Sequence, residues 1–388
     1  MKPIIVYEPG KRMQRIVQGL DISRFHDIKP LSSDKGKRIR ELRRIPSDTP
    51  AIYLWGAGYN NRGQLGTGGV TNTTRFTKFT GEGASGVTDV SCGNEFTIAI
   101  KNGVGYGCGY NYHGCLGIGT ATLSELYLKP MTGHGTAGIT NVACGEFHTI
   151  VSKSGVGYAC GQNSHGENCN GGTGESRSLA AMTGYGTSGI TSFSAGSSFT
   201  VINKSGVGYA CGANYAGELG TGNTTEYHTL TAMTGNGTSG ITGLACGTGH
   251  TVAYKSGVGY ACGYNTFGQL GTGNTTPYDT LTAMTGNGTS GITGLSCGSS
   301  FTVAIKSGVG YGCGSNNWGN YGTGGTGSSS TLAAMNGYGT SDITSISAGF
   351  NFTIASKVDI IYGTGLNNYG QLGVGNDTTN YSTLTKCV

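Results

Sequence analysis

The sequence predicts an all-β protein, a β-propeller of repeated blades preceded by a basic N-terminal extension. A Gly-x-Asn-x-x-Gly motif recurs seven times at intervals of 51 or 52 residues, a regularity typical of repeat architectures. Each full repeat holds four short segments with strand character, as one propeller blade does. Gly reaches 75 of 388 residues, but Pro is only 7 and no three-residue period exists, which excludes collagen. The first glycines of the motif are Gly58, Gly109, Gly161, Gly212, Gly263, Gly314 and Gly365.

The strands of one repeat can be followed through residues 241–290. "ITGLACG" alternates small or apolar with polar residues, as a half-buried strand does. "HTVAYKSG" is a second strand that ends in a Ser-Gly turn suited to a tight hairpin, and "VGYACGYN" is a third. "TFGQLGTGNTT" is a loop, "YDTLTAM" a fourth strand, and "TGNGTSG" the link to the next repeat.

The repeat resembles the regulator-of-chromosome-condensation repeat, and we expect a divergent bacterial or phage-like member of that family. The run from Gly58 to Gly68, "GYNNRGQLGTG", matches the family motif throughout, as does the run from Gly263 to Gly273. The resemblance covers residues 51–388 and implies a seven-bladed propeller. It does not imply one function, because propellers carry many. The family usually has Trp before the motif glycine, whereas this chain has Ala57, Cys108, Cys160, Cys211, Cys262, Cys313 and Thr364, so the blades must pack differently.

The number of blades is open between seven and six. Seven copies of the third and fourth strands occur, but only six copies of the first and second. A hairpin within residues 3–18 would fill the gap and give seven blades, which we favour. Alternatively, the first and last half-repeats join in a six-bladed ring.

The N-terminal extension differs in composition from the rest of the chain. Residues 1–50 hold 12 of the 24 Lys and Arg but 6 of the 19 Asp and Glu, so we place a domain boundary at residue 50. Residues 34–44 are expected to form a short helix. We expect this arm either to dock on other proteins of a larger assembly or to be a solvated tether; its candidate docking residues are Lys35, Lys37, Arg38, Arg40, Arg43 and Arg44.

The twelve cysteines do not predict a metal site. Pairs such as Cys92 and Cys108 lie 16 residues apart, whereas zinc ligands cluster at C-x2-4-C spacing. On the first and third strands of a blade they are too distant for a disulfide. We interpret the cysteines of the repeat, Cys211 included, as buried packing residues, and Cys115, Cys169 and Cys387 as the reactive or cross-linking thiols. No secretion signal is apparent at the N-terminus, so we expect cytoplasmic synthesis with reduced cysteines. No apolar run is long enough for a membrane helix.

No catalytic constellation appears, and we expect neither an enzyme nor a cofactor. A phosphate loop needs a helix behind it, so the glycine-rich loops are turns, with their Asn bonded to the loop backbone. His148 and His250 take a slot that is Phe in other repeats, which indicates packing. Glu95 and Glu146 lie in neighbouring loops but form no recognisable acid–base pair.

The repeats differ mainly in two loops, between the first and second and between the third and fourth strands. In an antiparallel blade these loops share one face, which becomes the candidate binding face. Neutral drift in exposed loops is the alternative interpretation. The candidate residues are Arg62, Tyr112, His113, His165, Tyr215, Phe267, Trp318, Tyr369, Glu95 and Glu146.

These features favour a non-enzymatic recognition propeller anchored by its arm, with a bacteriophage virion component as the most specific expectation. A nearly uncharged face with aromatic residues suits a carbohydrate or cell-surface ligand. The alternatives are the guanine-nucleotide exchange and chromatin-binding role of the family's namesake, and a proteinaceous enzyme inhibitor. The propeller holds 12 basic and 13 acidic residues, and this balance argues against nucleic acid as a partner.

Overall fold

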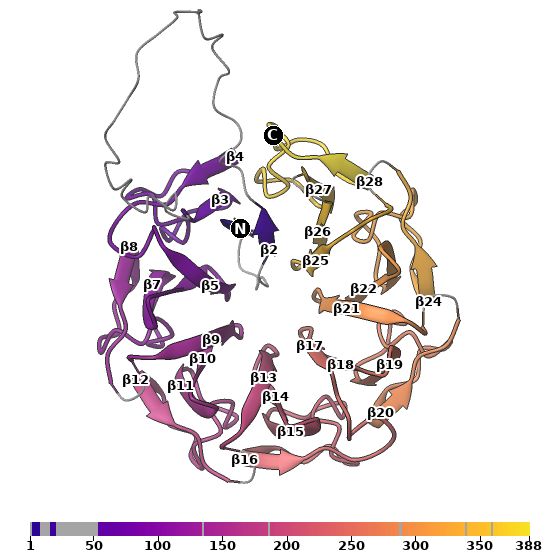
Figure 1. The fold of residues 1–388 in the computed structure, drawn as a ribbon, viewed down its shortest axis with the longest axis horizontal. Coiled ribbons are helices and arrows are strands. Elements are labelled where there is room, and N and C mark those ends of the chain that lie inside the picture. The colour runs from indigo at the N-terminus through magenta and orange to yellow at the C-terminus, as the bar shows by residue number, and fades with distance from the viewer. Residues whose placement is uncertain are drawn as a thin grey trace, which may run out of the picture.

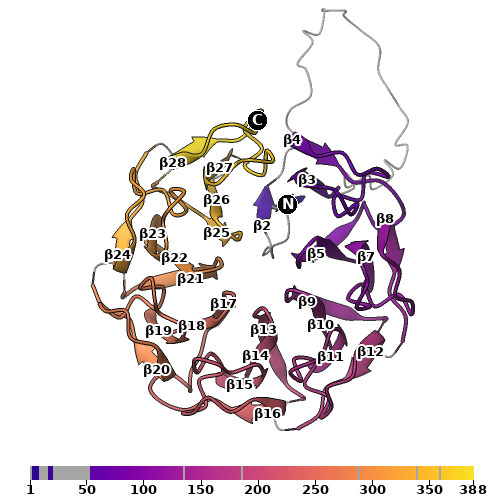
Figure 2. The same cartoon turned by 180° about the vertical axis from the view of Figure 1, so that it is seen from behind.

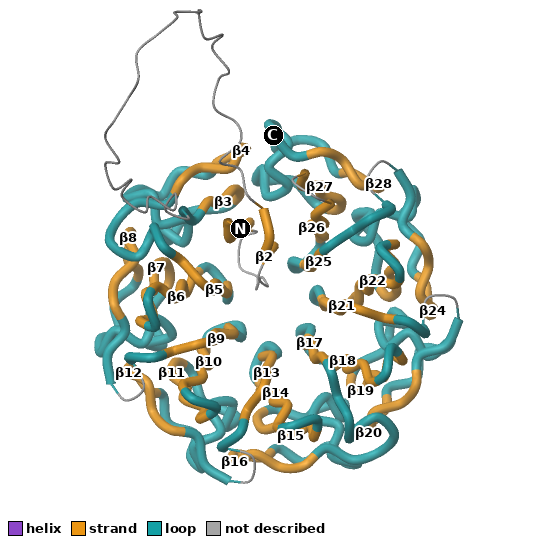
Figure 3. Tube along the Cα trace, viewed as in Figure 1, coloured by secondary structure: helices purple, strands orange, loops and turns teal. Residues whose placement is uncertain are grey.

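The computed structural model shows a ring of four-stranded β-sheets around a central axis (Figures 1 and 3). It describes the backbone of residues 2–7 and 16–20, and residues 53–388 except 134–135, 185–186, 287–288, 338–339 and 358–359. All secondary-structure elements in these residues are strands, so the all-β propeller is confirmed. No helix in this part of the chain is long and apolar enough to cross a membrane. The helix expected at 34–44 and the docking residues from Lys35 to Arg44 lie outside the described residues.

Six sheets, blades 2 to 7, each consist of four consecutive antiparallel strands, with the first strand innermost. The strands of blades 2 to 4 are β5 (Val87–Cys92), β6 (Phe96–Lys101), β7 (Val104–Tyr110), β8 (Ser124–Pro130), β9 (Ile139–Cys144), β10 (His148–Lys153), β11 (Val156–Gly161), β12 (Ser176–Ala181), β13 (Ile190–Ala195), β14 (Phe199–Lys204), β15 (Val207–Gly212) and β16 (Tyr227–Ala232). Those of blades 5 to 7 are β17 (Gly243–Cys246), β18 (His250–Lys255), β19 (Val258–Gly263), β20 (Tyr278–Ala283), β21 (Ile292–Cys297), β22 (Phe301–Lys306), β23 (Val309–Gly314), β24 (Ser329–Ala334), β25 (Ser345–Ala348), β26 (Phe352–Lys357), β27 (Ile360–Gly365) and β28 (Tyr381–Lys386).

The remaining sheet is a composite of two distant segments. It joins β3 (Trp55–Gly58) and β4 (Thr73–Lys78) to an N-terminal hairpin of β1 (Lys2–Tyr7) and β2 (Ile16–Leu20), in the order β2-β1-β3-β4. β1 runs parallel to β3, and the long chain between them permits this, since parallel neighbours need a long connection. β1 also lies beside β5, and β2 beside β25 and β26. The ring thus contains six blades of consecutive strands and one composite sheet, which occupies the gap between blades 7 and 2.

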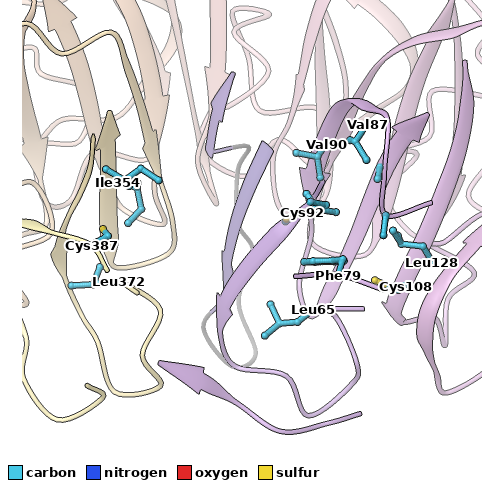
Figure 4. Close-up of a cluster of buried hydrophobic side chains, with 14 of the residues drawn as sticks. Leu65, Phe79, Val87, Val90, Cys92, Cys108, Leu128, Ile354, Leu372 and Cys387 are labelled. Carbon is cyan, nitrogen blue, oxygen red and sulfur yellow. The ribbon is translucent and has the colours of Figure 1, made fainter. Parts of the chain in front are cut away.

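The hydrophobic core is divided among the contacts between neighbouring sheets. Figure 4 shows one cluster, in which Leu65 and Phe79 of the composite sheet meet Cys108 of blade 2. Corresponding clusters place Met131 beside Cys160, Met233 beside Cys262 and Met284 beside Cys313. The small residue before the motif glycine therefore packs against a flexible methionine or a Phe of the preceding sheet. This contact is the difference in blade packing that the sequence led us to expect.

A loop glycine completes each of these contacts. A Cβ added at Gly117 would lie 2.9 Å from Cys160 Sγ, and one at Gly220 would lie 3.0 Å from Cys262 Sγ. Blade 3 has Cys169 at this position, and it forms a disulfide with Cys211 of blade 4. The expectations that all cysteines stay reduced, and that Cys211 is only a packing residue, are therefore wrong. Spacing within one repeat could not reveal a pair whose Cα atoms lie 5.6 Å apart across two blades.

The other cysteines are buried thiols. Cys115 and Cys387 were expected to be reactive, but both are buried in apolar clusters. Burial raises the pKa of the Cys115 thiol well above its ordinary value, and it raises the pKa of Cys387 as well. Because the thiolate is the reactive form, neither thiol is suited to cross-linking in the folded protein. Cys108, Cys160, Cys262 and Cys313 fill the packing role that the repeat predicted.

The ring has two faces, which Figures 1 and 2 show from opposite sides. These faces differ in sequence and charge. One face carries the loops between first and second and between third and fourth strands, and we call it the varied loop face. The opposite face carries the short turns between second and third strands. Each second strand of blades 2 to 7 ends at this opposite face in a lysine: Lys101, Lys153, Lys204, Lys255, Lys306 and Lys357.

Candidate functional site

The loops of the varied loop face are fixed by the motif Asn. In blade 5, Asn265 Oδ1 accepts a hydrogen bond from the Leu270 backbone N–H at 3.0 Å. Its Nδ2 donates to the Asn274 carbonyl at 3.0 Å and the Thr276 carbonyl at 2.8 Å. The same Oδ1 bond forms in all seven copies of the loop. The predicted structural role of this Asn is confirmed, and the residues between it and the next glycine are left to face solvent.

A belt of backbone hydrogen bonds joins the first loops of successive blades. The Asn94 N–H donates to the Glu146 carbonyl at 2.9 Å, and the Glu146 N–H donates to the Ser197 carbonyl at 3.2 Å. The series continues from Ser197 to Thr248, then to Ser299 and to Phe350, at 3.1–3.3 Å. The first loops of blades 2 to 7 are therefore linked into one rim rather than standing as independent segments.

Large exposed aromatic side chains gather on the varied loop face. Tyr112 is 61% exposed and Tyr215 60%, while Phe267 and Trp318 are 44% and 42% exposed. Tyr264, which sequence comparison among the repeats did not single out, is 45% exposed. Aromatic residues of this kind dominate protein recognition surfaces because they bury much area at low entropic cost.

Other candidate residues are tied together across neighbouring blades. The Arg62 guanidinium pairs with Glu95 at 3.4 Å. His113 contacts Glu175 at 2.5 Å and His165 contacts Glu226 at 2.8 Å, each reaching the following blade.

Further contacts extend this network. The Tyr215 hydroxyl lies 3.2 Å from His165 Nε2. Tyr369 packs edge-on against Tyr59, with ring centroids 5.2 Å apart. Glu146 accepts a hydrogen bond from the Ser197 hydroxyl, so Glu95 and Glu146 have separate partners, and the structure brings no acid–base pair together there.

His148 and His250 lie in the core instead. Both are fully buried, and their Nε2 atoms lie 3.1 Å from the hydroxyls of Thr200 and Thr302. Each ring takes the place that Phe199 or Phe301 takes in other blades, as the repeat predicted.

A pocket of about 290 Å³ opens on the varied loop face between blades 4 and 5. Tyr215, Tyr264 and Phe267 line it, together with the carboxylate-bearing Glu218. Gly249 makes room for it, because a Cβ there would lie 2.5 Å from the Tyr264 ring. Within-chain comparison could have found Tyr264, since the position after the motif glycine varies from Tyr to Gln, Ala, Ser and Leu.

Glu218 and its counterpart Glu167 in blade 3 are buried carboxyls. Glu218 accepts hydrogen bonds from the backbone N–H groups of Tyr215 and Ala216, at 3.0 and 2.7 Å. In other repeats a glutamine makes this bond, as Gln269 does to the Phe267 N–H at 3.0 Å. Burial raises the pKa of both glutamates because it disfavours their charged forms.

Comparison with known proteins gives matches along most of the chain. The family described as "Regulator of chromosome condensation (RCC1) repeat" matches residues 51–100, 102–152 and 256–305. The ultraviolet-B receptor UVR8 of Arabidopsis thaliana is 28% identical over 84% of this chain and 74% of its own length. The probable E3 ubiquitin-protein ligase HERC3 of Homo sapiens is 30% identical over 49% of this chain, which spans only 18% of that protein.

Solved structures share the fold. Human WBSCR16 superposes with a TM-score of 0.76 at 17% identity, covering 87% of this chain and 94% of that one. Prp20p of Saccharomyces cerevisiae, described with its binding to Gsp1p and histones, gives a TM-score of 0.74 at 15% identity, covering 86% and 85%. The repeat matches, the relative aligned over most of both chains and the common propeller agree with the motif that recurs from Gly58 to Gly365. This chain therefore contains RCC1 repeats at residues 51–100, 102–152 and 256–305 and shares the β-propeller fold of these solved structures.

Proposed function

We propose that this chain is a non-enzymatic recognition protein that binds another protein through the varied loop face. The observation that carries the proposal is the gathering of exposed aromatic side chains on that one face, above loops held by the motif Asn and the hydrogen-bonded rim. A preorganised surface loses little conformational entropy when a partner binds. Prp20p, described with the proteins Gsp1p and histones, supports a protein partner through the shared fold.

Site-directed photo-crosslinking tests this proposal. A photoreactive phenylalanine analogue replaces Tyr112 or Trp318 on the varied loop face. The control position is Val207, which is 36% exposed at the start of β15, next to a turn of the opposite face. We expect discrete cross-linked protein products from the first two positions and none from Val207. Products from Val207 alone, or equal products from all three positions, would contradict the assignment of the face.

A second candidate is nucleotide exchange on a small GTPase, favoured by the match to Prp20p. Because that match is 15% identical, it carries the fold rather than the activity. Release of a fluorescent nucleotide from purified small GTPases, measured with the full chain and with Tyr112→Ser as the face variant, separates exchange from simple binding.

The narrower expectations stay predictions. They comprise a place in a bacteriophage virion or another larger assembly, a carbohydrate or cell-surface ligand, and an enzyme-inhibitor role. None of the relatives and structures reported above is described as a virion protein or an enzyme inhibitor. The candidate docking residues of the arm, from Lys35 to Arg44, lie outside the described residues.

A further inference from the structure

The pocket between blades 4 and 5 contains a charged group that the fold does not require. Glu218 is only 2% exposed, and the bond it accepts from the Ala216 N–H is one that neutral Gln64, Gln269 and Gln371 accept in other repeats. Its second carboxylate oxygen accepts a further bond from the Tyr215 N–H. A buried carboxylate in place of an amide raises the energetic cost of burial, and one additional hydrogen bond from a neutral N–H offsets only part of that cost. The hydrogen bonds of the loop therefore do not explain why residue 218 is charged rather than a neutral glutamine.

The described residues supply no cation to balance this carboxylate. The lysines at the ends of the second strands lie on the opposite face, and neither this pocket nor the adjoining hollow has Lys or Arg in its lining. The adjoining hollow shares Tyr215 and Tyr264 with the pocket and adds the exposed carboxylate of Asp279. Negative charge is thus concentrated on the side from which a ligand would enter.

The walls of the pocket suit a cation as well as the carboxylate does. Tyr215, Tyr264 and Phe267 present aromatic rings from two neighbouring blades. Aromatic faces attract ammonium and guanidinium groups through their quadrupole, and rings grouped around one site form the usual cage for such ligands. A volume of about 290 Å³ is at the small end for ligand cavities, so it fits one side chain rather than a cofactor.

We propose that this pocket receives a single cationic side chain, an arginine or lysine, of the partner protein. Its aliphatic stem would pack between the aromatic rings while its charged head approaches Glu218. This inference rests on the proposed function, because it names the chemical group that the varied loop face recognises.

The test uses the full chain with Nα-acetyl-arginine methylamide as the probe and its neutral isostere, Nα-acetyl-citrulline methylamide, as the ligand control. Saturation-transfer NMR titrations measure both dissociation constants. We expect the citrulline compound to bind at least fivefold more weakly. Glu218→Gln should weaken arginine binding at least fivefold, and Tyr264→Ser, which introduces the residue found at Ser315 in blade 6, should weaken it as well.

Glu167→Gln is the matched control, because Glu167 takes the same place in its repeat but lies outside the pocket lining. It should leave arginine binding unchanged. Equal binding of arginine and citrulline probes, or equal binding by Glu218→Gln and the unsubstituted chain, overturns the pocket assignment. If photo-crosslinking at Tyr112 still captures a partner in that case, the recognition face stands and only the cationic ligand is wrong.

Discussion

The contact that holds the Cys169–Cys211 disulfide between blades 3 and 4 recurs between blades 4 and 5, where it should accept an engineered disulfide. The perturbation is Gly220→Cys, which places a cysteine where blade 3 has Cys169. A Cβ at Gly220 lies 3.0 Å from Cys262 Sγ, and a disulfide places the Cβ of one cysteine about 3 Å from the sulfur of the other. The terminal methyl of Met233, 2.8 Å from that Cβ, has to rotate away, as a flexible thioether can.

The expected stabilisation follows from the length of chain that the new bond closes. The Gly220–Cys262 pair has the same 42-residue separation as the native disulfide, which corresponds to about 4 kcal/mol of lost unfolded-state entropy. Gly220 has a φ of +64°, so a non-glycine residue there costs about 1 kcal/mol. The remaining gain of about 3 kcal/mol would raise the melting temperature of a propeller of this size by about 4 °C.

Two measurements check this prediction. Intact mass with and without alkylation reports whether the bond forms in a glutathione buffer, and thermal unfolding is followed with and without reductant. Gly222→Cys is the control, since this glycine also has a positive φ but faces Thr234 and Thr280 rather than a cysteine. If the new thiol stays alkylatable in oxidised, folded protein, our account of the interblade contact is refuted.

Three further predictions concern the native residues. Cys169→Gly, which restores the residue of the other repeats, should lower the melting temperature by about 4 °C in oxidising buffer but not in reductant; equal melting of both proteins in oxidising buffer would contradict a stabilising bond. Asn265→Ala should lower the free energy of unfolding by about 3 kcal/mol in urea titrations, because the buried Leu270 N–H and two carbonyls lose their partner; a loss below about 1 kcal/mol would show that the loop holds itself. Glu218→Gln should raise the free energy of unfolding at pH 7, because the raised pKa of Glu218 makes the folded chain lose stability as pH rises above the ordinary value of 4.5. That fall should be absent from the variant's stability–pH profile, so parallel profiles from pH 4 to 8 would be evidence against the raised pKa.

The periodic part of the structure could be predicted from the sequence because the residues that determine it lie within a single repeat. The strand order within a blade, the Asn-bonded loop and the sharing of one face by two loop sets all follow from residues within about 50 positions of one another. His250 could be placed in the core because Phe occupies its slot in neighbouring repeats.

Features that depend on contact between repeats were not predictable in the same way. Cys169 and Cys211 belong to different repeats, and only the packing of a loop against the next blade brings them together. Burial of Glu218 likewise depends on its neighbours rather than on its polarity, which by itself favours exposure. The parallel pairing of β1 with β3 joins two segments that a long connection separates, and the repeat pattern does not include β1.

The division between constant contacts and variable loops has a consequence for how this surface can specialise. The backbone at Tyr215 and Ala216 is fixed by Asn214 and Glu218, while the Tyr215 side chain is 60% exposed. Substitutions at such positions change the recognition surface with little effect on folding, as for other exposed sites without special backbone geometry. Trp318 in blade 6 and Phe267 in blade 5 occupy the same place as Ala216, so one backbone displays an indole, a phenyl or a methyl group. The residues at these positions can therefore vary largely independently of the stability of the ring.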